Sequence, residues 1–217
     1  MKKRSARDSL SSLERQSGSH PASPGPPPRD LQQEALTLFR ALGDERGAAS
    51  ALDRLAQHLY ALGDGDQARQ LHEEALAIRR KLGDAWGLGW SLAHLGDLAT
   101  DGGDYAAARA HYAECLAVIR RLGTRPIIAK ALEGFAALAA VTDPERAQRL
   151  LGAAAALHES SGAGAPRDDR QRVSRLTERI QQQLAPYTAA AAWDAGRAMT
   201  LEEAIAYALQ GTEPFHA

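Results

Sequence analysis

The chain contains 217 residues, with a formal net charge of −1 and a single cysteine. One cysteine excludes an internal disulfide and a cysteine-based structural zinc site. The nearly balanced charge gives no bulk electrostatic reason to bind nucleic acid or an acidic membrane. Alanine (45 residues) and leucine (28) are abundant, whereas there are only 3 valines and 6 isoleucines. Because alanine and leucine favour helices and β-branched residues favour sheets, the composition predicts an all-α fold.

Residues 1–28 are predicted to form a disordered tail rich in proline and serine. Five of the ten prolines lie there, and such a segment buries too little apolar surface to offset the entropy of ordering it. The basic start of the chain is followed by polar residues, where a signal peptide needs an apolar stretch. No run of residues approaches the ~18 apolar residues of a membrane span. We therefore expect a cytoplasmic protein.

Residues 29–160 contain an internal repeat with a period of 40 residues. The tripeptide Leu-Gly-Asp at positions 42–44 recurs at 82–84 and, as Leu-Gly-Thr, at 122–124. Residues 29–44 also match residues 69–84 at 9 of 16 positions. A fixed period of this size is typical of stacked supersecondary units. The segment divides into a half unit and three full units: 29–44, 45–84, 85–124 and 125–160.

Each unit is predicted to form two helices. Apolar or small residues at spacings of three and four, as in Leu52, Leu55, Ala56 and Leu59, make one buried stripe on a helix. The glycine of each Leu-Gly pair stands where a helix end favours a left-handed residue. In the third unit, Asp143-Pro144 indicates a helix start, with aspartate as the cap and proline at the first helical position.

This pattern resembles the tetratricopeptide repeat. That family has small residues at three positions of each unit, where its two helices pack closely. Here those positions hold Ala56, Ala68 and Ala75; Gly96, Ala108 and Cys115; and Ala136, Ala147 and Ala154. The resemblance implies a right-handed α-solenoid of about three helix-pair repeats. The units here are longer than the family's usual ~34 residues, because the second helix is extended.

Residues 161–217 are predicted to be capping helices and a short tail. A polar helix is expected from Asp169 to Leu184, and Pro186 should end or kink it. Thr200 and Glu203 have the spacing of a capping box, which opens a short amphipathic helix to Leu209. Solenoids need such atypical ends to cover their last apolar face.

Two strings in the C-terminal half carry a more specific resemblance. They are PERAQRLLGAA at 144–154 and AWDAGRAMTLEEA at 192–204. They look like the end of the repeat region in bacterial signalling ATPases, including LuxR-type and MalT-like transcription regulators. The resemblance implies a sensor or scaffold arm whose partner is a nucleotide-binding ATPase. This chain has no G-x-x-x-x-G-K-[ST] string to hold a nucleotide, and the residues after Leu209 are too few for a helix-turn-helix.

The array is predicted to begin with half a unit. The positions where a partner helix should lie hold Ser12, Arg15, Gln16 and Ser19, which have no apolar face to bury. The apolar residues of the half unit then lack their usual cover, which makes them a possible association face. Its main residues are Leu31, Leu38 and Phe39.

No catalytic or metal-binding constellation is present in the sequence. None of the seven histidines has a metal-ligand spacing such as H-E-x-x-H, and no G-x-S-x-G string occurs. His111 lies one helical turn before Cys115, which could make a Cys–His nucleophile. The alternative is a buried, inert thiol, because Cys115 occupies a packing position that Ala75 fills one unit earlier. We expect neither an enzyme nor a cofactor.

The first helix of each unit carries the candidate binding residues. In a tetratricopeptide array these helices line the concave groove, and residues one turn from the packing stripe project into it. Trp90 is notable because its counterparts are Ser50 and Lys130; it is either a binding anchor or a packing residue beside Trp86. The candidate set is Asp53, Arg54, Gln57, Tyr60, Trp90, His94, Asp97, Lys130 and Glu133.

Three functions remain open from the sequence. The first is a protein–protein interaction module that binds a peptide or protein in the concave groove, since its mixed charges suit such a ligand. The second is the small-molecule-sensing arm of a MalT-like regulator. The third is a self-assembling scaffold or remnant, suggested by the incomplete first unit.

Overall fold

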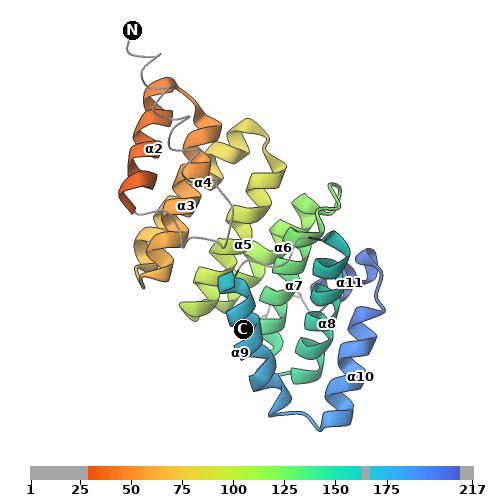
Figure 1. Cartoon of the computed structure of the whole chain (residues 1–217). Coiled ribbons are helices and arrows are strands. Elements are labelled where there is room, and N and C mark those ends of the chain that lie inside the picture. The colour runs from red at the N-terminus through yellow and green to blue at the C-terminus, as the bar shows by residue number, and fades with distance from the viewer. Residues whose placement is uncertain (1–28, 163–166, 211–217) are drawn as a thin grey trace. The chain divides into compact units, whose positions relative to one another are not determined.

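The computed structural model describes residues 29–162 and 167–210, and all ten elements in these residues are helices (Figure 1). The predicted tail at 1–28 lies outside the described residues, as do 163–166 and 211–217. The helices are α2 (Arg29–Leu42), α3 (Glu45–Ala61), α4 (Gly65–Leu82), α5 (Ala85–Asp101), α6 (Tyr105–Ile119), α7 (Arg125–Ala139), α8 (Pro144–Ser161), α9 (Arg167–Gln181), α10 (Pro186–Arg197) and α11 (Leu201–Leu209). The predicted all-α class is therefore confirmed.

The helix boundaries repeat with the period seen in the sequence. Helices α3, α5 and α7 begin 40 residues apart, as do α4 and α6. The aspartates at 44, 64, 104 and 143 cap the helices that follow, each accepting a hydrogen bond from a backbone N–H in the first turn. The glycines at 43, 83 and 123 have positive φ angles of 72°, 64° and 62°. At these positions glycine avoids the steric cost that a Cβ atom would add.

The chain falls into two compact units that meet within α5, unit 1 ending at Ser91 and unit 2 starting at Leu92. In unit 1, α3 packs against both α2 and α4. Its core cluster includes Leu52 of the predicted stripe and Ala75 of the predicted packing positions, and also residues that the sequence argument did not name: Leu36, Ala48, Ala49 and Ala51. The ring of Phe39 packs so closely on α3 that a Cβ atom on Gly47 would lie 2.7 Å from its Cγ atom. Phe39 is therefore partly buried and packs against the core of unit 1. Leu31 and Leu38 are also half-buried.

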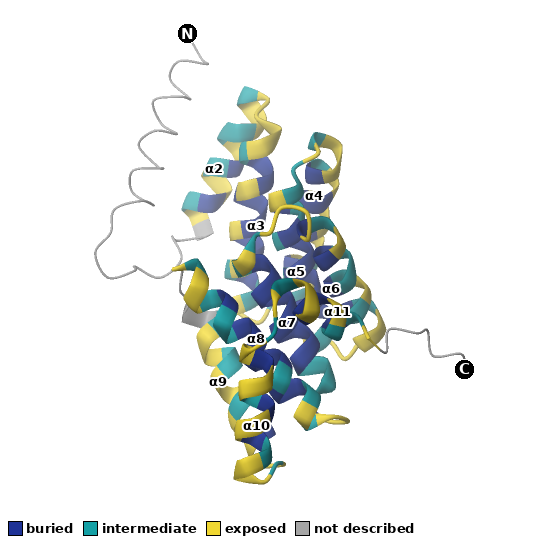
Figure 2. Cartoon of the chain, turned by 90° about the vertical axis from the view of Figure 1, so that its right-hand side faces the viewer, coloured by how far each residue is buried: buried dark blue, intermediate teal, exposed yellow. Residues whose placement is uncertain are grey.

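Unit 2 is organised around α7 and α8, with α6, α10 and α11 packed against them. The Tyr112 ring is fully buried against two glycines. A Cβ atom on Gly96 would lie 2.7 Å from its Cδ1 atom, and one on Gly134 would lie 2.6 Å from its Cε2 atom. All nine small-residue packing positions predicted across the three units are buried. Figure 2 shows this buried interior and the exposed residues along α9 and α10.

The closing segment differs in part from the prediction. Helix α9 runs from Arg167 to Gln181, and Pro186 begins a further helix, α10, rather than merely ending the one before it. Proline is well tolerated at the first helical position because the N–H it lacks would have no intrahelical partner there. The capping box of Thr200 and Glu203 is confirmed at the start of α11.

Helices α8 and α10 lie in close backbone contact at two glycines. A Cβ atom on Gly152 would lie 3.2 Å from the Cα atom of Trp193, and one on Gly196 would lie 2.8 Å from the carbonyl carbon of Arg149. The two strings singled out in the sequence therefore pack against each other. Among the described helices, none combines the length and apolar character needed to cross a membrane.

Candidate functional site

The nine predicted binding residues divide by burial. Arg54 and Gln57 are exposed, and three others are half-buried: Tyr60, Trp90 and His94. The remaining four, Asp53, Asp97, Lys130 and Glu133, are buried. These four were expected to project into an open groove, whereas each makes polar contacts within its own unit.

Asp53 is the centre of a buried polar cluster in unit 1. Its carboxylate forms an ion pair with Arg79 of α4, lies 2.9 Å from Nδ1 of His72 and accepts a 3.1 Å hydrogen bond from the Ser91 hydroxyl. Arg79 also donates to the Gly87 carbonyl oxygen at 2.7 Å. Paired in this way, Asp53 joins α3, α4 and the start of α5 and is not displayed to solvent.

An accessible surface lies next to this cluster. The hydrogen bond between Ser91 and Asp53 brings the start of α5 against α3, so their chain neighbours Trp90 and Arg54 belong to adjacent first helices. Trp90 contacts Trp86 edge-to-face, with ring centroids 6.3 Å apart, and Trp86 is 55% exposed. Trp90 therefore packs beside Trp86, as one of the two sequence interpretations expected, and Trp86 remains open to solvent.

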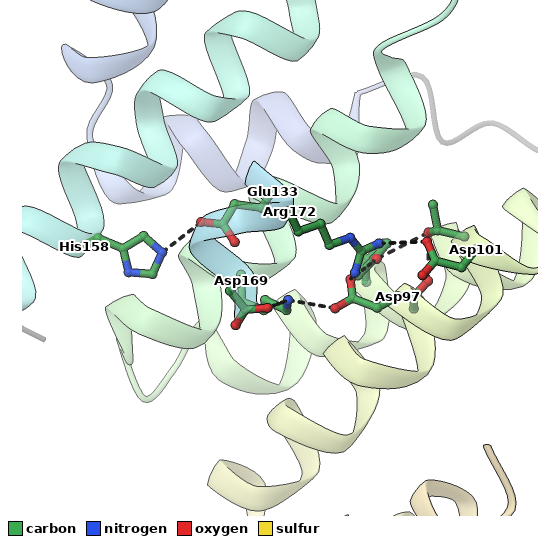
Figure 3. Close-up of polar contacts among 10 residues, drawn as sticks. Asp97, Asp101, Glu133, His158, Asp169 and Arg172 are labelled. Atoms are coloured by element: carbon green, nitrogen blue, oxygen red, sulfur yellow. Dashed lines mark hydrogen bonds and ion pairs between the residues drawn. The ribbon is translucent and has the colours of Figure 1, made fainter. Parts of the chain in front are cut away.

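A second polar cluster in unit 2 involves Asp97, Lys130 and α9. The carboxylate of Asp97 in α5 forms two ion pairs. Its Oδ2 atom lies 2.7 Å from Nζ of Lys130 in α7, and its Oδ1 atom lies 2.6 Å from Nη1 of Arg172 in α9. Lys130 also pairs with Asp169 of α9, and Tyr112 donates a 2.7 Å hydrogen bond to Asp97. Figure 3 shows Arg172 directed at Asp97 and Asp101.

Burial and charge act in opposite directions on this cluster. Burial by itself would raise the pKa of Asp97, but the Lys130 ammonium and the Arg172 guanidinium overcome it and lower the pKa to about 2. Burial would likewise lower the pKa of Lys130, but the carboxylates of Asp97 and Asp169 hold it above its usual value. Both groups stay charged at neutral pH, although each is only 4% exposed.

The depressed pKa of Asp97 predicts a specific acid sensitivity. Its value falls from 3.8 to about 2 on folding, so its contribution to stability is complete above pH ~4 and is lost as the pH falls towards ~2. The expected contribution is about 2 kcal/mol. Urea unfolding between pH 5 and pH 2 should show a steeper acid loss in the wild type than in Asp97→Asn. Equal slopes would contradict the assignment.

Glu133 of α7 belongs to a third polar contact in unit 2. Its Oε1 atom lies 2.9 Å from Nε2 of His158, and Figure 3 marks this contact with a dashed line. Its Oε2 atom is buried with no hydrogen-bond partner in the protein. Glu133 also lines a cavity of about 10 Å³ together with Lys130, Val173 and other residues of α5, α7 and α9. A cavity of this size holds about one water molecule.

Asp169 and Arg172 are site residues that the sequence argument missed. The sequence predicted a polar helix here, but it did not show that Asp169 and Arg172 of this helix would form ion pairs with Lys130 and Asp97. One signal was present: two opposite charges three residues apart lie on the same side of a helix. Such a pair is common on solvated helices, so spacing alone could not identify its partners.

Cys115 lies in its packing position rather than at a reactive surface. It is fully buried, and burial raises the pKa of its thiol to about 12. We expect a thiol-specific reagent at pH 8 to leave Cys115 unmodified in the native chain and to modify it fully in urea. Rapid modification of the folded chain would instead support the Cys–His interpretation.

Within residues 29–162 and 167–210, no three histidine, cysteine or carboxylate side chains cluster as metal ligands.

Helix pairs with a 40-residue period, packed against their neighbours in chain order, define a helical repeat protein. The tetratricopeptide repeat family matches this chain at residues 48–83 and 88–122. The chain therefore contains tetratricopeptide repeats in that segment. A search of curated proteins finds no match to the chain.

Proposed function

We propose that this protein is an interaction module whose first helices bind a peptide or protein partner. The observation that carries the proposal is the pair of matched tetratricopeptide repeats at residues 48–83 and 88–122. In unit 1 the exposed residues Arg54, Gln57 and Trp86 offer a surface of mixed chemistry. No catalytic domain is found beside the repeats.

The proposed binding surface in unit 1 combines Arg54, Gln57 and the Trp86–Trp90 pair. Arginine and tryptophan dominate the binding energy of many interfaces, because each joins a large apolar contact area to a directional polar group. The surface is neither strongly basic nor continuously apolar. Its chemistry suits a peptide with both apolar and acidic side chains, the carboxylate pairing with Arg54.

We further propose that the module is the sensor or scaffold arm of a bacterial signalling or transcription-regulator system. Support comes from the two strings, at residues 144–154 and 192–204, that resemble the repeat ends of signalling ATPases. In this proposal the partner is a nucleotide-binding signalling ATPase.

The proposal is tested by affinity capture followed by a binding measurement. Wild-type protein and the Arg54→Ala/Trp90→Ala variant are used as baits, and captured proteins are identified by mass spectrometry. The control bait is Glu73→Ala, which changes an exposed residue of the second helix α4. We expect a saturable partner whose affinity falls at least about ten-fold in the double variant and is unchanged in the control.

Two results would contradict the assignment of this surface. Equal binding by all three baits would move the site to another face, such as the one that includes Leu31 and Leu38. Equal loss in Glu73→Ala would show a general loss of structure. Thermal unfolding of each bait separates these outcomes.

A further inference from the structure

We infer that the first-helix face of unit 2 binds an amphipathic helix carrying aspartate and arginine one turn apart, and that α9 is its resident intrachain ligand. The partner that fits is a helix of the same chemistry from another protein, which replaces α9. This inference deepens the proposed function. It concerns a face different from the Arg54–Trp90 surface, so each can fail without the other.

The contacts of α9 resemble those of a bound helical peptide. Asp169 pairs with Lys130 of α7, and Arg172 one turn later pairs with Asp97 of α5. In the following turns Leu176 and Ile180 are buried. The outer side of α9 is exposed and polar: Arg170, Gln171, Ser174, Arg175, Glu178 and Arg179. Two charges at one end and an apolar stripe behind them form a recognition pattern of the helix-in-groove type.

The order of the charges gives the face its specificity. Lys130 receives the carboxylate, while Asp97 and Asp101 receive the guanidinium. A helix with the two charges exchanged would place like charges together in a buried setting, which is strongly unfavourable. The face therefore selects both the chemistry and the direction of the helix that occupies it.

Helix α9 buries less apolar surface than its neighbour α8. Its buried apolar residues are Leu176 and Ile180, whereas α8 buries six apolar residues along its length. Segments with few buried apolar contacts are the first to open. Asp97 and Lys130 lie 2.7 Å apart, so in this proposal they can stay paired with each other, with added water, when α9 leaves. An incoming helix with the same charges restores the lost ion pairs, so the free-energy change on exchanging α9 for that helix is close to zero.

The Oε2 atom of Glu133 makes no hydrogen bond to α9. This atom is buried without a hydrogen-bond partner, and Glu133 lines the same small cavity as Val173 of α9. The cavity has room for about one water molecule to donate to this atom, and a donor on the helix itself would replace that water. A helix with a hydrogen-bond donor at the position of Val173 would have a group to offer Glu133. We therefore expect a partner helix to differ from α9 at that position.

The test uses the full-length chain and a labelled peptide with the sequence of residues 167–181. Binding is measured by fluorescence anisotropy to the wild type and to Asp169→Arg/Arg172→Asp, which makes the resident α9 repel its own face. The matched control is Arg175→Asp/Glu178→Arg, the same exchange of charges on the exposed side of α9. We expect the peptide to bind the first variant at least ten-fold more tightly than the wild type or the control.

Two further peptides test the specificity. A peptide with its own aspartate and arginine exchanged should lose binding by at least ten-fold. A peptide with glutamine in place of Val173 should bind more tightly than the parent. If Asp169→Arg/Arg172→Asp does not fold, Asp169→Asn/Arg172→Gln replaces it. That variant should also bind the parent peptide more tightly than the wild type does, by a smaller factor.

Hydrogen–deuterium exchange supplies an independent measurement on the wild type. Excess peptide should speed the exchange of amides in α9 and leave those in α8 and α10 unchanged. The inference is overturned if neither variant binds the peptide more tightly than the wild type, or if the parent and charge-exchanged peptides bind alike. In either case α9 is a fixed structural part of unit 2.

Discussion

Replacing Lys130 by methionine is expected to destabilise unit 2 by about 3 kcal/mol. Methionine keeps the length and much of the packing of the lysine stem but removes the ammonium group that pairs with Asp97 and Asp169. The two carboxylates then remain in a buried site with Arg172 as the main compensating charge. Removing one partner of a buried ion pair is costly because the other charge stays desolvated. Urea unfolding at pH 7, followed by circular dichroism, measures the loss.

The matched control is Lys81→Met, the same substitution at an exposed ion pair. Lys81 pairs with Glu45 at 2.5 Å, and both side chains are largely open to solvent. Exposed pairs contribute between about 0 and 1 kcal/mol, so the stability should hardly change. Similar losses in the two variants would show that burial does not set the strength of the Lys130 cluster.

The second large effect is expected at the contact between α8 and α10. Gly152→Ala and Gly196→Ala should each destabilise the protein by about 2–3 kcal/mol. In each case the new methyl group would meet the backbone of the facing helix: Trp193 for one variant and Arg149 for the other. A backbone cannot turn aside as a flexible side chain can, so the two helices must move apart.

The sign of this effect distinguishes packing from helix propensity. In an unpacked helix, alanine in place of glycine stabilises by about 1 kcal/mol. A gain in stability at Gly152 would therefore contradict the close contact. Ala190→Ser, at an exposed position of α10, should change the stability by less than about 0.5 kcal/mol. The double glycine variant should lose less than the sum of the two single losses, because one separation of the helices relieves both clashes.

Much of the local structure could be predicted from the sequence. The 40-residue period, the capping aspartates and the turn glycines are short-range signals that depend on a few neighbouring residues. The start of α8 at Asp143-Pro144 and the capping box of α11 are signals of the same kind. The beginning of α10 was missed, because a proline after a polar helix indicates a stop as readily as a new start.

The candidate site could be predicted only in part. Register along a repeat put Arg54 and Gln57 on α3, where both are exposed, and their role in binding stays a prediction. The same register could not show that Asp53 would be paired with Arg79, because that contact joins two helices. It could not show that α9 would cover Asp97 and Lys130, because the partners lie about 40 and 75 residues away along the chain. Charged residues at such separations meet only through the tertiary fold.

The sequence by itself determined the helical class, the repeat period and the small residues that let paired helices approach. These features follow from backbone sterics and from side-chain volume at fixed spacings, which act within one helix pair. Only the tertiary structure decided which face stays open. In unit 1 Trp86 and Arg54 remain exposed, whereas in unit 2 α9 satisfies the buried charges of Asp97 and Lys130. The physical reason is that a buried charge needs a specific partner, and the fold brings α9 to it.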